Sequence, residues 1–588
     1  MTDSRGVTSY EYDTRDRLVK QTDPDGRSLS YNYDAAGNRV SLTIPSGTTG
    51  YTFDALNRLA TVTDPDGGVT SYTYDAVGNR ASVTYPNGAV AVYTYDSLNR
   101  LTNLLNRKSD GEVISSYAYT LAAAGNRIRV VEDTGRKVNY SYDKTYKLTN
   151  ESINDPVSGS RMFNYTYDAV GNRLTKTDNG VVTTYTYDAN NRLLTEGSTT
   201  YIYDNNGNTL AKSSAIENVI YGYDFQNHLV RANITNSASE SSFVDYVYDA
   251  NGIRVQKTEN EANVTKYIVD KNQPFAQVLL ETDGGNSNIV SYVYGDDLIS
   301  QNRVGSLSYY HYDGQMSTRK LTNETGTTTD SYAYDAFGIL MNSTGITENN
   351  YLYTGEQYDP NIGFYYLRSR MYNPSIGRFL TPDMNEGSIY DPVSLHKYTY
   401  SANNPINLVD PSGQMYLDIY VSLTIMSVLN SYYMMLFKDL YVTVGIADEV
   451  LRPAYALYYK SLELIAAGYD NPGVWQLLTT SREQIASGHT MLLKAYSQNL
   501  KEFAKDRLMP IKGKFKTADD LLHFDIINMV SNPSDPSSYI TINILKDLQD
   551  IAKIGEEFIN KIIEDPTKKG KIYGASTSFI NLINAVLP

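Results

Sequence analysis

Cysteine is absent from this chain of 588 residues, tryptophan occurs once and histidine five times. Without cystines, a chain of this length must be held together by side-chain packing and backbone hydrogen bonds. Residues 1–6 show no positively charged leader followed by an apolar core, so no secretory signal peptide is visible. Either the protein is exported by another route, or the natural N-terminus lies further upstream.

Positive charge is scarce as well. The chain has 51 Lys and Arg against 66 Asp and Glu, which gives a net charge of −15, and about −13 of this charge lies in the first 414 residues. Because phosphates are bound mainly by Lys and Arg, we expect no nucleic acid partner for this acidic part. The remaining residues are nearly neutral. This uneven charge, together with the length, predicts two or more structural units.

Tyrosine is abundant, with 54 copies, and many of them belong to an internal repeat. Residues 31–39 read YNYDAAGNR, and related sequences return at 72–80, 93–100, 165–173 and 185–192, with a spacing near 21 residues. Degenerate copies begin at Tyr10, Tyr51, Tyr117, Tyr140, Tyr201, Tyr221, Tyr246 and Tyr332. A period of this length is typical of an architecture built from repeated supersecondary units.

Each repeat predicts a β-hairpin. The Tyr-x-Tyr alternation puts both rings on one face of a strand. Asp followed by x-x-Gly-Asn is turn chemistry, because Asp accepts from nearby amides while Gly and Asn tolerate positive φ. Asp-Pro-Asp-Gly at 23–26 and 64–67 supplies turns at the other end, and His311 lies among strand tyrosines, where we expect a structural role. Single hairpins are marginal in water, so those of residues 1–350 should pair laterally into one long sheet.

A second pattern fills residues 351–413. It contains YTGE at 353–356, GFYYLRSRMY at 363–372, GRFL at 377–380, NNP at 403–405 and DPSG at 410–413. This order resembles the RHS repeat-associated core that ends the shell of RHS/YD-repeat proteins. The resemblance, which extends more distantly to teneurins and toxin-complex C proteins, implies a mainly β fold in which a coiled sheet of hairpins forms a shell or cocoon. It further implies a polymorphic toxin whose own C-terminal domain is the cargo, with a cognate immunity protein as partner and a location outside the cell or at its surface.

Two interpretations compete for the carboxylates Asp383, Asp391 and Asp410 of this core. Each stands next to a proline, which is typical of turns. Alternatively, two of them form a dyad in which one carboxyl holds a proton while the other activates water. The resemblance implies an aspartyl autoprotease that cuts just after DPSG, with Asp410 as the motif residue, Asp383 as its partner and Arg378 as a charge that keeps a carboxylate ionised. Gln414 departs from the family pattern, which usually has a bulky apolar residue there.

Helical periodicity replaces the tyrosine repeat in residues 414–588. Apolar residues recur at spacings of three and four in 451–467, 474–500, 517–530 and 540–563, which predicts a smaller all-α domain. Residues 419–437 form an uncharged run of 19, long enough for a membrane span, and 572–587 form a second such run.

The sequence leaves the activity of this C-terminal part open. The uncharged runs favour a membrane-inserting or pore-forming domain, while a nuclease would need metal ligands and basic residues. Candidate ligands are Glu483, His489, Asp519, Asp520, His523 and Asp525, and candidate phosphate contacts are Lys494, Lys501, Lys505, Arg507, Lys512, Lys514 and Lys516. No HExxH motif or Walker loop is present, and we expect no cofactor and no metal in the core. An adhesive YD-repeat protein without a toxin is the alternative for the whole chain.

Overall fold

The computed structural model describes residues 1–387, 392–414 and 417–418. The chain divides into two units, Met1–Ser431 and Tyr432–Pro588, and all described residues belong to the first. The predicted helices, both uncharged runs and Asp391 therefore lie outside the described residues. Within the described part there is no α-helix, only the 3-10 turns η1 (Tyr353–Gly355), η2 (Pro392–Leu395) and η3 (Ser401–Asn403), and no helix there is long and apolar enough to cross a membrane.

One antiparallel sheet accounts for most of the described fold. Each strand from β3 to β34 pairs with its neighbours in sequence, and no ladder joins β34 to β3 among the described strands. The first strands of the sheet are β3 (Ser9–Tyr12), β4 (Leu18–Thr22), β5 (Ser28–Tyr33), β6 (Arg39–Ile44), β7 (Gly47–Phe53), β8 (Leu59–Thr63), β9 (Val69–Tyr74), β10 (Arg80–Thr84), β11 (Val90–Tyr95), β12 (Leu101–Arg107), β13 (Val113–Leu121), β14 (Arg127–Glu132), β15 (Lys137–Tyr142), β16 (Leu148–Asp155), β17 (Gly159–Tyr167) and β18 (Arg173–Asp178).

The sheet continues without interruption as the repeat becomes less regular. Its later strands are β19 (Val181–Tyr187), β20 (Leu193–Glu196), β21 (Thr199–Tyr203), β22 (Thr209–Ser213), β23 (Glu217–Tyr223), β24 (Leu229–Asn236), β25 (Ser241–Tyr248), β26 (Arg254–Glu259), β27 (Asn263–Asp270), β28 (Gln277–Asp283), β29 (Asn288–Tyr294), β30 (Leu298–Arg303), β31 (Ser306–Tyr312), β32 (Thr318–Thr322), β33 (Thr328–Tyr334) and β34 (Leu340–Thr344). A separate hairpin of β1 (Thr2–Asp3) and β2 (Gly6–Val7) precedes them.

The turn of each repeat forms as the sequence predicts. In the repeat at 31–39, Asp34 Oδ1 accepts the Asn38 amide at 2.9 Å, and the Gly37 amide donates to the Asp34 carbonyl at 3.2 Å. Gly37 has a φ of 97°, a conformation that glycine adopts without steric cost. A register shift next to Tyr33 marks a bulge, which increases the local twist of the hairpin.

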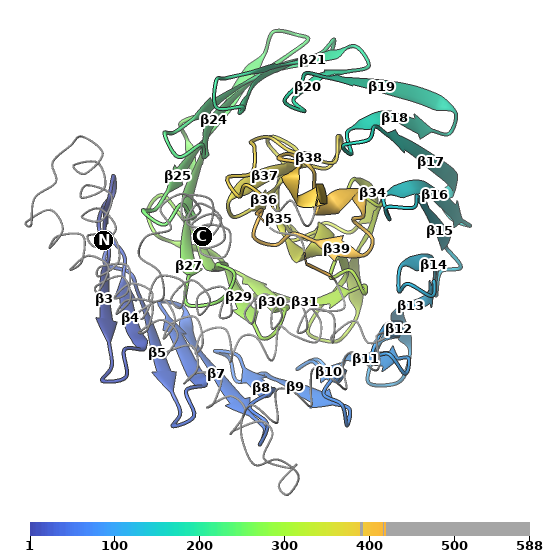
Figure 1. The fold of residues 1–588 in the computed structure, drawn as a ribbon. Coiled ribbons are helices and arrows are strands. Elements are labelled where there is room, and N and C mark those ends of the chain that lie inside the picture. The colour runs from blue at the N-terminus through green and yellow to red at the C-terminus, as the bar shows by residue number, and fades with distance from the viewer. Residues whose placement is uncertain (388–391, 415–416, 419–588) are drawn as a thin grey trace, which may run out of the picture. The chain divides into compact units, whose positions relative to one another are not determined.

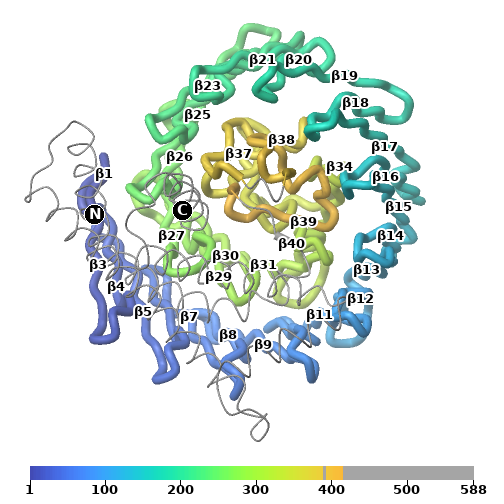
Figure 2. Tube along the Cα trace, in the orientation of Figure 1, coloured from blue at the N-terminus to red at the C-terminus, as the bar shows by residue number. Residues whose placement is uncertain are grey.

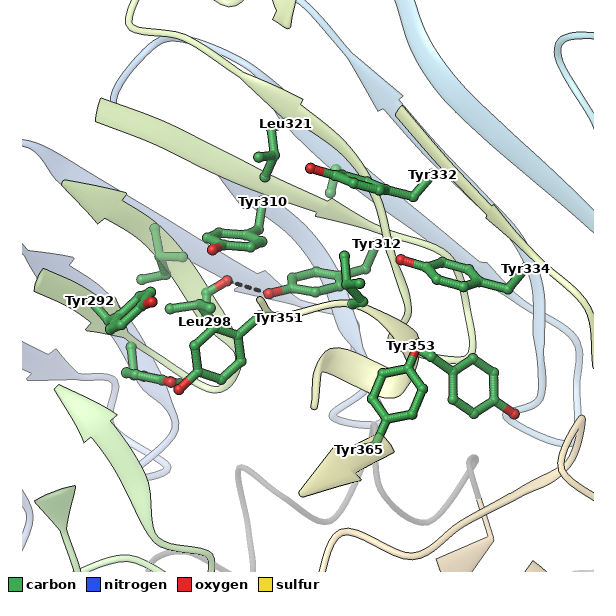
Figure 3. Close-up of a cluster of buried hydrophobic side chains, with 14 of the residues drawn as sticks. Tyr292, Leu298, Tyr310, Tyr312, Leu321, Tyr332, Tyr334, Tyr351, Tyr353 and Tyr365 are labelled. Atoms are coloured by element: carbon green, nitrogen blue, oxygen red, sulfur yellow. Dashed lines mark hydrogen bonds between the residues drawn. The ribbon is translucent and has the colours of Figure 1, made fainter. Parts of the chain in front are cut away.

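The second tyrosine of a repeat links neighbouring hairpins. Its hydroxyl donates to a backbone carbonyl of the preceding hairpin, as Tyr312 does to Leu298 at 2.7 Å (Figure 3). The same bond recurs in the pairs Tyr33–Leu18, Tyr74–Leu59, Tyr95–Arg80, Tyr142–Arg127, Tyr167–Leu148, Tyr187–Arg173, Tyr223–Thr209, Tyr248–Leu229 and Tyr334–Thr318. Phenylalanine would fill the same space without this bond, which explains why the repeat uses tyrosine.

The twisted sheet coils round on itself, so that its late strands lie inside its early ones (Figure 1). Side chains join the two layers: Arg39 of β6 pairs with Asp270 of β27, and Arg80 of β10 pairs with Asp297 next to β30 at 2.5 Å. The predicted coiled sheet of hairpins with a shell-like form is therefore confirmed.

Residues 351–387 and 392–414 lie within the coil, as the path of the chain shows (Figure 2). They form a four-stranded sheet of β35 (Gln357–Asp359), β36 (Phe364–Leu367), β37 (Arg370–Asn373) and β38 (Arg378–Phe379), followed by β39 (Leu408–Val409), which pairs with β40 (Leu417–Asp418). Tyrosine hydroxyls attach this core to the wall: Tyr365 donates to the Gly338 carbonyl at 3.0 Å and Tyr372 to the Phe337 carbonyl at 2.7 Å.

Candidate functional site

The DPSG segment follows β39 and forms a turn. Asp410 is buried, and its Oδ1 accepts from the Ser412 hydroxyl and from the Gln414 amide, both at 3.1 Å. The Gly413 amide approaches the Asp410 carbonyl at 3.4 Å. Asp410 therefore acts as the turn residue that the sequence predicts.

Asp383 lies after β38 and also stabilises a turn. Its Oδ1 accepts the Asn385 amide at 2.9 Å, and its own amide donates to the Lys397 carbonyl at 2.8 Å. Burial raises the pKa of the Asp383 carboxyl, although the nearby Arg370 opposes this rise. A carboxylate with a raised pKa is a stronger base than one in water.

Arg370, the first residue of β37, brings the two carboxylates together. One terminal nitrogen of its guanidinium lies 2.7 Å from Asp383 Oδ2 and 3.5 Å from Asp410 Oδ2. Its other terminal nitrogen donates to the Lys397 carbonyl at 3.1 Å, and its Nε donates to the Gly413 carbonyl. Arg370 thus contacts both aspartates that the sequence singled out.

Arg378 lies elsewhere in the core. Its guanidinium donates to Asn172 Oδ1 at 3.0 Å and to the Asn191 carbonyl, and it stacks over the rings of Tyr187 and Tyr398. Burial lowers its pKa. These contacts attach the core to the wall, and the positive charge that the sequence assigned to Arg378 is supplied at the carboxylates by Arg370.

The turn between β36 and β37 contacts the DPSG segment at three successive carbonyls. Arg368 donates to the Pro411 carbonyl, the Ser369 amide approaches the Ser412 carbonyl at 3.3 Å, and Arg370 donates to the Gly413 carbonyl. Sequence reasoning gave no role to these arginines, although both stand in the motif GFYYLRSRMY, where an Arg-x-Arg spacing could have drawn attention to them.

Glu356 completes the site behind Arg368. One terminal nitrogen of Arg368 lies 2.9 and 2.8 Å from the two oxygens of this buried carboxylate. Burial raises the pKa of Glu356, Arg368 opposes that rise, and the Asp410 charge adds to it. Two carboxylates, Glu356 and Asp383, and two arginines, Arg368 and Arg370, therefore lie around the DPSG segment, whose own Asp410 adds a third carboxylate.

Other predicted positions have simpler surroundings. His311 is fully buried, its Nε2 lies 2.9 Å from the Thr322 hydroxyl, and burial lowers its pKa to about 3, which fits the predicted structural role. No group of three or more His, Asp or Glu side chains that would hold a metal occurs in residues 1–387, 392–414 and 417–418. The candidate ligands and basic residues of the predicted C-terminal domain lie outside that part.

Comparison with known proteins identifies the family. The teneurin YD-shell model matches residues 121–406, and the RHS repeat model matches residues 1–28, 12–49, 53–90 and 75–110. The chain is an RHS/YD-repeat protein. The YD-shell match ends at residue 406, so the DPSG segment of this RHS/YD-repeat protein lies just beyond it.

Relatives and a solved structure agree with this family. The chain is 32% identical over 269 residues to a tRNA3(Ser)-specific nuclease WapA of Bacillus spizizenii, and 36% identical over 198 residues to a tRNA(Glu)-specific nuclease WapA of Bacillus subtilis subsp. natto. These matches cover 45% and 33% of this chain but only 11% and 8% of the relatives. The crystal structure of TcdB2-TccC3 shares the fold with a TM-score of 0.59 at 19% identity, over 69% of this chain and 24% of that one.

Proposed function

We propose that this RHS/YD-repeat protein is a toxin-delivery shell whose core cuts the chain after Gly413 and so releases an effector in residues 414–588. The observation that carries the proposal is the placement of the DPSG segment. It includes the buried Asp410 and lies near the partly buried Asp383, and Arg370 contacts both carboxylates and the Gly413 carbonyl. A segment that served only as a turn would not need a buried cation on its carbonyl.

The geometry supports hydrolysis of the Gly413–Gln414 bond, whose two sides the site contacts. The Asp383 carboxylate takes a proton from water, and the oxygen of that water forms a bond to the Gly413 carbonyl carbon. Arg370 Nε–H stabilises the negative charge that develops on the Gly413 oxygen. The Gln414 nitrogen must gain a proton as the carbon–nitrogen bond breaks. We assign this donation to Asp410, whose Oδ1 lies 3.1 Å from that nitrogen and accepts its N–H in the intact chain, so the step requires Asp410 to enter the reaction with a proton.

The relatives support an effector as cargo. Two WapA proteins that match this chain are named for different tRNAs. This is consistent with similar shells that carry different activities. We extend this pattern to residues 414–588 and expect a cognate immunity protein as partner and release outside the cell or at its surface. A nuclease and a membrane-inserting domain both remain candidates for the effector.

Expression of residues 415–588 alone in bacteria tests the cargo. We expect toxicity that a small protein encoded next to this chain relieves, with tRNA degradation for a nuclease or dye leakage for a membrane-inserting domain. Harmless accumulation of the fragment would contradict the toxin and favour the adhesive alternative.

Limited proteolysis tests the enclosure. If the shell holds the effector, residues after 414 should be cut more slowly in the intact protein than in the fragment 415–588. Equal rates of cutting in the two samples would contradict enclosure.

A further inference from the structure

The turn between β36 and β37 has an unusual conformation for its sequence. Arg368 has a φ of 60°, the left-handed region that a glycine would occupy at lower cost in a two-residue hairpin turn. The Ser369 amide also donates to the Leu367 carbonyl at 2.7 Å, which keeps the turn tight. Strain of this kind persists where the side chain is used, and here the Arg368 side chain extends to the DPSG segment.

Each contact of this turn fixes one residue of the segment. Arg368 holds the carbonyl of Pro411, Ser369 faces that of Ser412, and Arg370 holds that of Gly413. These three contacts hold the segment against the turn. Because every residue offers a backbone carbonyl, they do not choose its register by themselves.

Glycine at position 413 makes the register unique. A Cβ atom there would lie 2.4 Å from the Leu367 carbonyl oxygen and 3.1 Å from the Arg370 amide nitrogen, and the φ of Gly413 is 70°. The backbone of the turn cannot move away from such an atom without breaking the β36–β37 ladder, in which Leu367 is opposite Arg370. Neither Ser412 nor Gln414 would therefore fit in the place of Gly413 while Arg368 and Arg370 hold the segment against the turn, whereas a segment released by Arg368 could adopt other registers.

Glu356 holds the arginine that makes the first of these contacts. Arg368 is fixed between both oxygens of Glu356 and the Ala276 carbonyl, which accepts from its Nε at 3.0 Å. A guanidinium held by Glu356, by the Ala276 carbonyl and over the Phe275 ring keeps little rotational freedom, so its contact with Pro411 is placed in advance.

We propose that Glu356 and Arg368 are positioning residues that set which peptide bond after Asp410 is presented to the carboxylates. This inference rests on the proposed self-cleavage, and it names the determinant of the cut position within it. Glu356 acts through Arg368 and does not touch the bond that is cut.

The test compares Glu356→Gln and Arg368→Lys with the wild type as full-length proteins. Intact-mass measurement of the fragments should give a single cut position for the wild type, and slower cutting at two or more adjacent bonds for both variants. Arg231→Ala is the control, because it breaks an Arg–carboxylate pair with Asp245 on the exposed face of the sheet and should leave the position and rate unchanged. Variants that cut at the wild-type bond and rate would overturn the inference and leave self-cleavage standing.

Hydrogen exchange of the amides of residues 412–414 provides a readout that does not need cleavage. Loss of a charge-assisted hydrogen bond should accelerate exchange there by about tenfold or more in Glu356→Gln, and not in Arg231→Ala. If the wild type stays uncut while exchange rises in Glu356→Gln as expected, self-cleavage is refuted and the positioning role of Glu356 and Arg368 is retained. If exchange is unchanged in Glu356→Gln, the positioning role is refuted whether or not the wild type cleaves.

Discussion

Substitution of Asp270 by Asn should loosen the coil, because it removes the partner of an arginine that faces inward from the repeat. Asp270 is fully buried, accepts from the Tyr31 hydroxyl at 3.0 Å, and forms an ion pair with Arg39 across the two layers of the sheet. Asn preserves the shape but not the charge, so the Arg39 guanidinium is left with an uncompensated charge in a buried site.

The expected cost is large compared with that of an exposed pair. Breaking a buried ion pair by removing one partner costs about 3–5 kcal/mol. The matched control, Asp245→Asn, breaks the pair with Arg231, whose side chain is 47% exposed, and should cost about 0–1 kcal/mol. Replacing Arg39 by Met together with Asp270→Asn should restore much of the loss, because no unpaired charge remains.

Hydrogen exchange is the suitable assay, since a chain of this size does not unfold in one step. Amides of β6 and β27 should exchange at least about a hundredfold faster in Asp270→Asn, and those of β24 and β25 should change little in Asp245→Asn. Equal effects of the two substitutions would refute the reasoning that buried ion pairs join the layers.

Two further predictions concern the wall. Burial and the neighbouring Asp335 raise the pKa of Glu151 from 4.5 to about 8. The stability that this group contributes is therefore fully present below the pKa of the unfolded chain and is lost as the pH rises through about 8. Unfolding rates at about pH 9 and about pH 6 should differ less in Glu151→Gln than in the wild type, and an unchanged pH dependence would contradict this. Tyr312→Phe should lower stability by about 1–2 kcal/mol, because the Leu298 carbonyl loses its donor, whereas substitution of the exposed Tyr12 should cost almost nothing; equal denaturation midpoints for the two variants would argue against the hydroxyl links.

Local chemistry in the repeat was predictable because its contacts are close in sequence. Asp34 and Asn38 are four residues apart, and their turn follows from the residue types alone. The alternation of tyrosines indicated one buried face, but the acceptors of their hydroxyls depend on the stagger between hairpins. Arg39 and Asp270 are 231 residues apart, and only the coiling of the sheet brings them together.

In the candidate site, too, the sequence indicated the residues but not all of the contacts between them. The motif and the family resemblance indicated Asp383 and Asp410, and the structure places both at one arginine. The family resemblance implied Arg378 as the positive charge at these carboxylates. The β36–β37 hairpin instead turns Arg370 toward the carboxylates, and this pairing depends on how the small core sheet packs. The spacing of residues in the sequence could not distinguish Arg370 from Arg378 as the arginine at the two carboxylates.

Intact-mass measurement of the purified full-length protein tests self-release most directly. We expect the wild type to separate under denaturing conditions into a fragment that ends at or within a few residues of Gly413 and a fragment that contains the remaining residues. Asp410→Asn and Asp383→Asn should remain single chains, because Asn keeps the turn shape but cannot transfer a proton. A wild type that remains one chain would contradict self-release and point to Gln414 as the departure that disables it, while a cleaved Asp410→Asn would show that this carboxyl is not the acid.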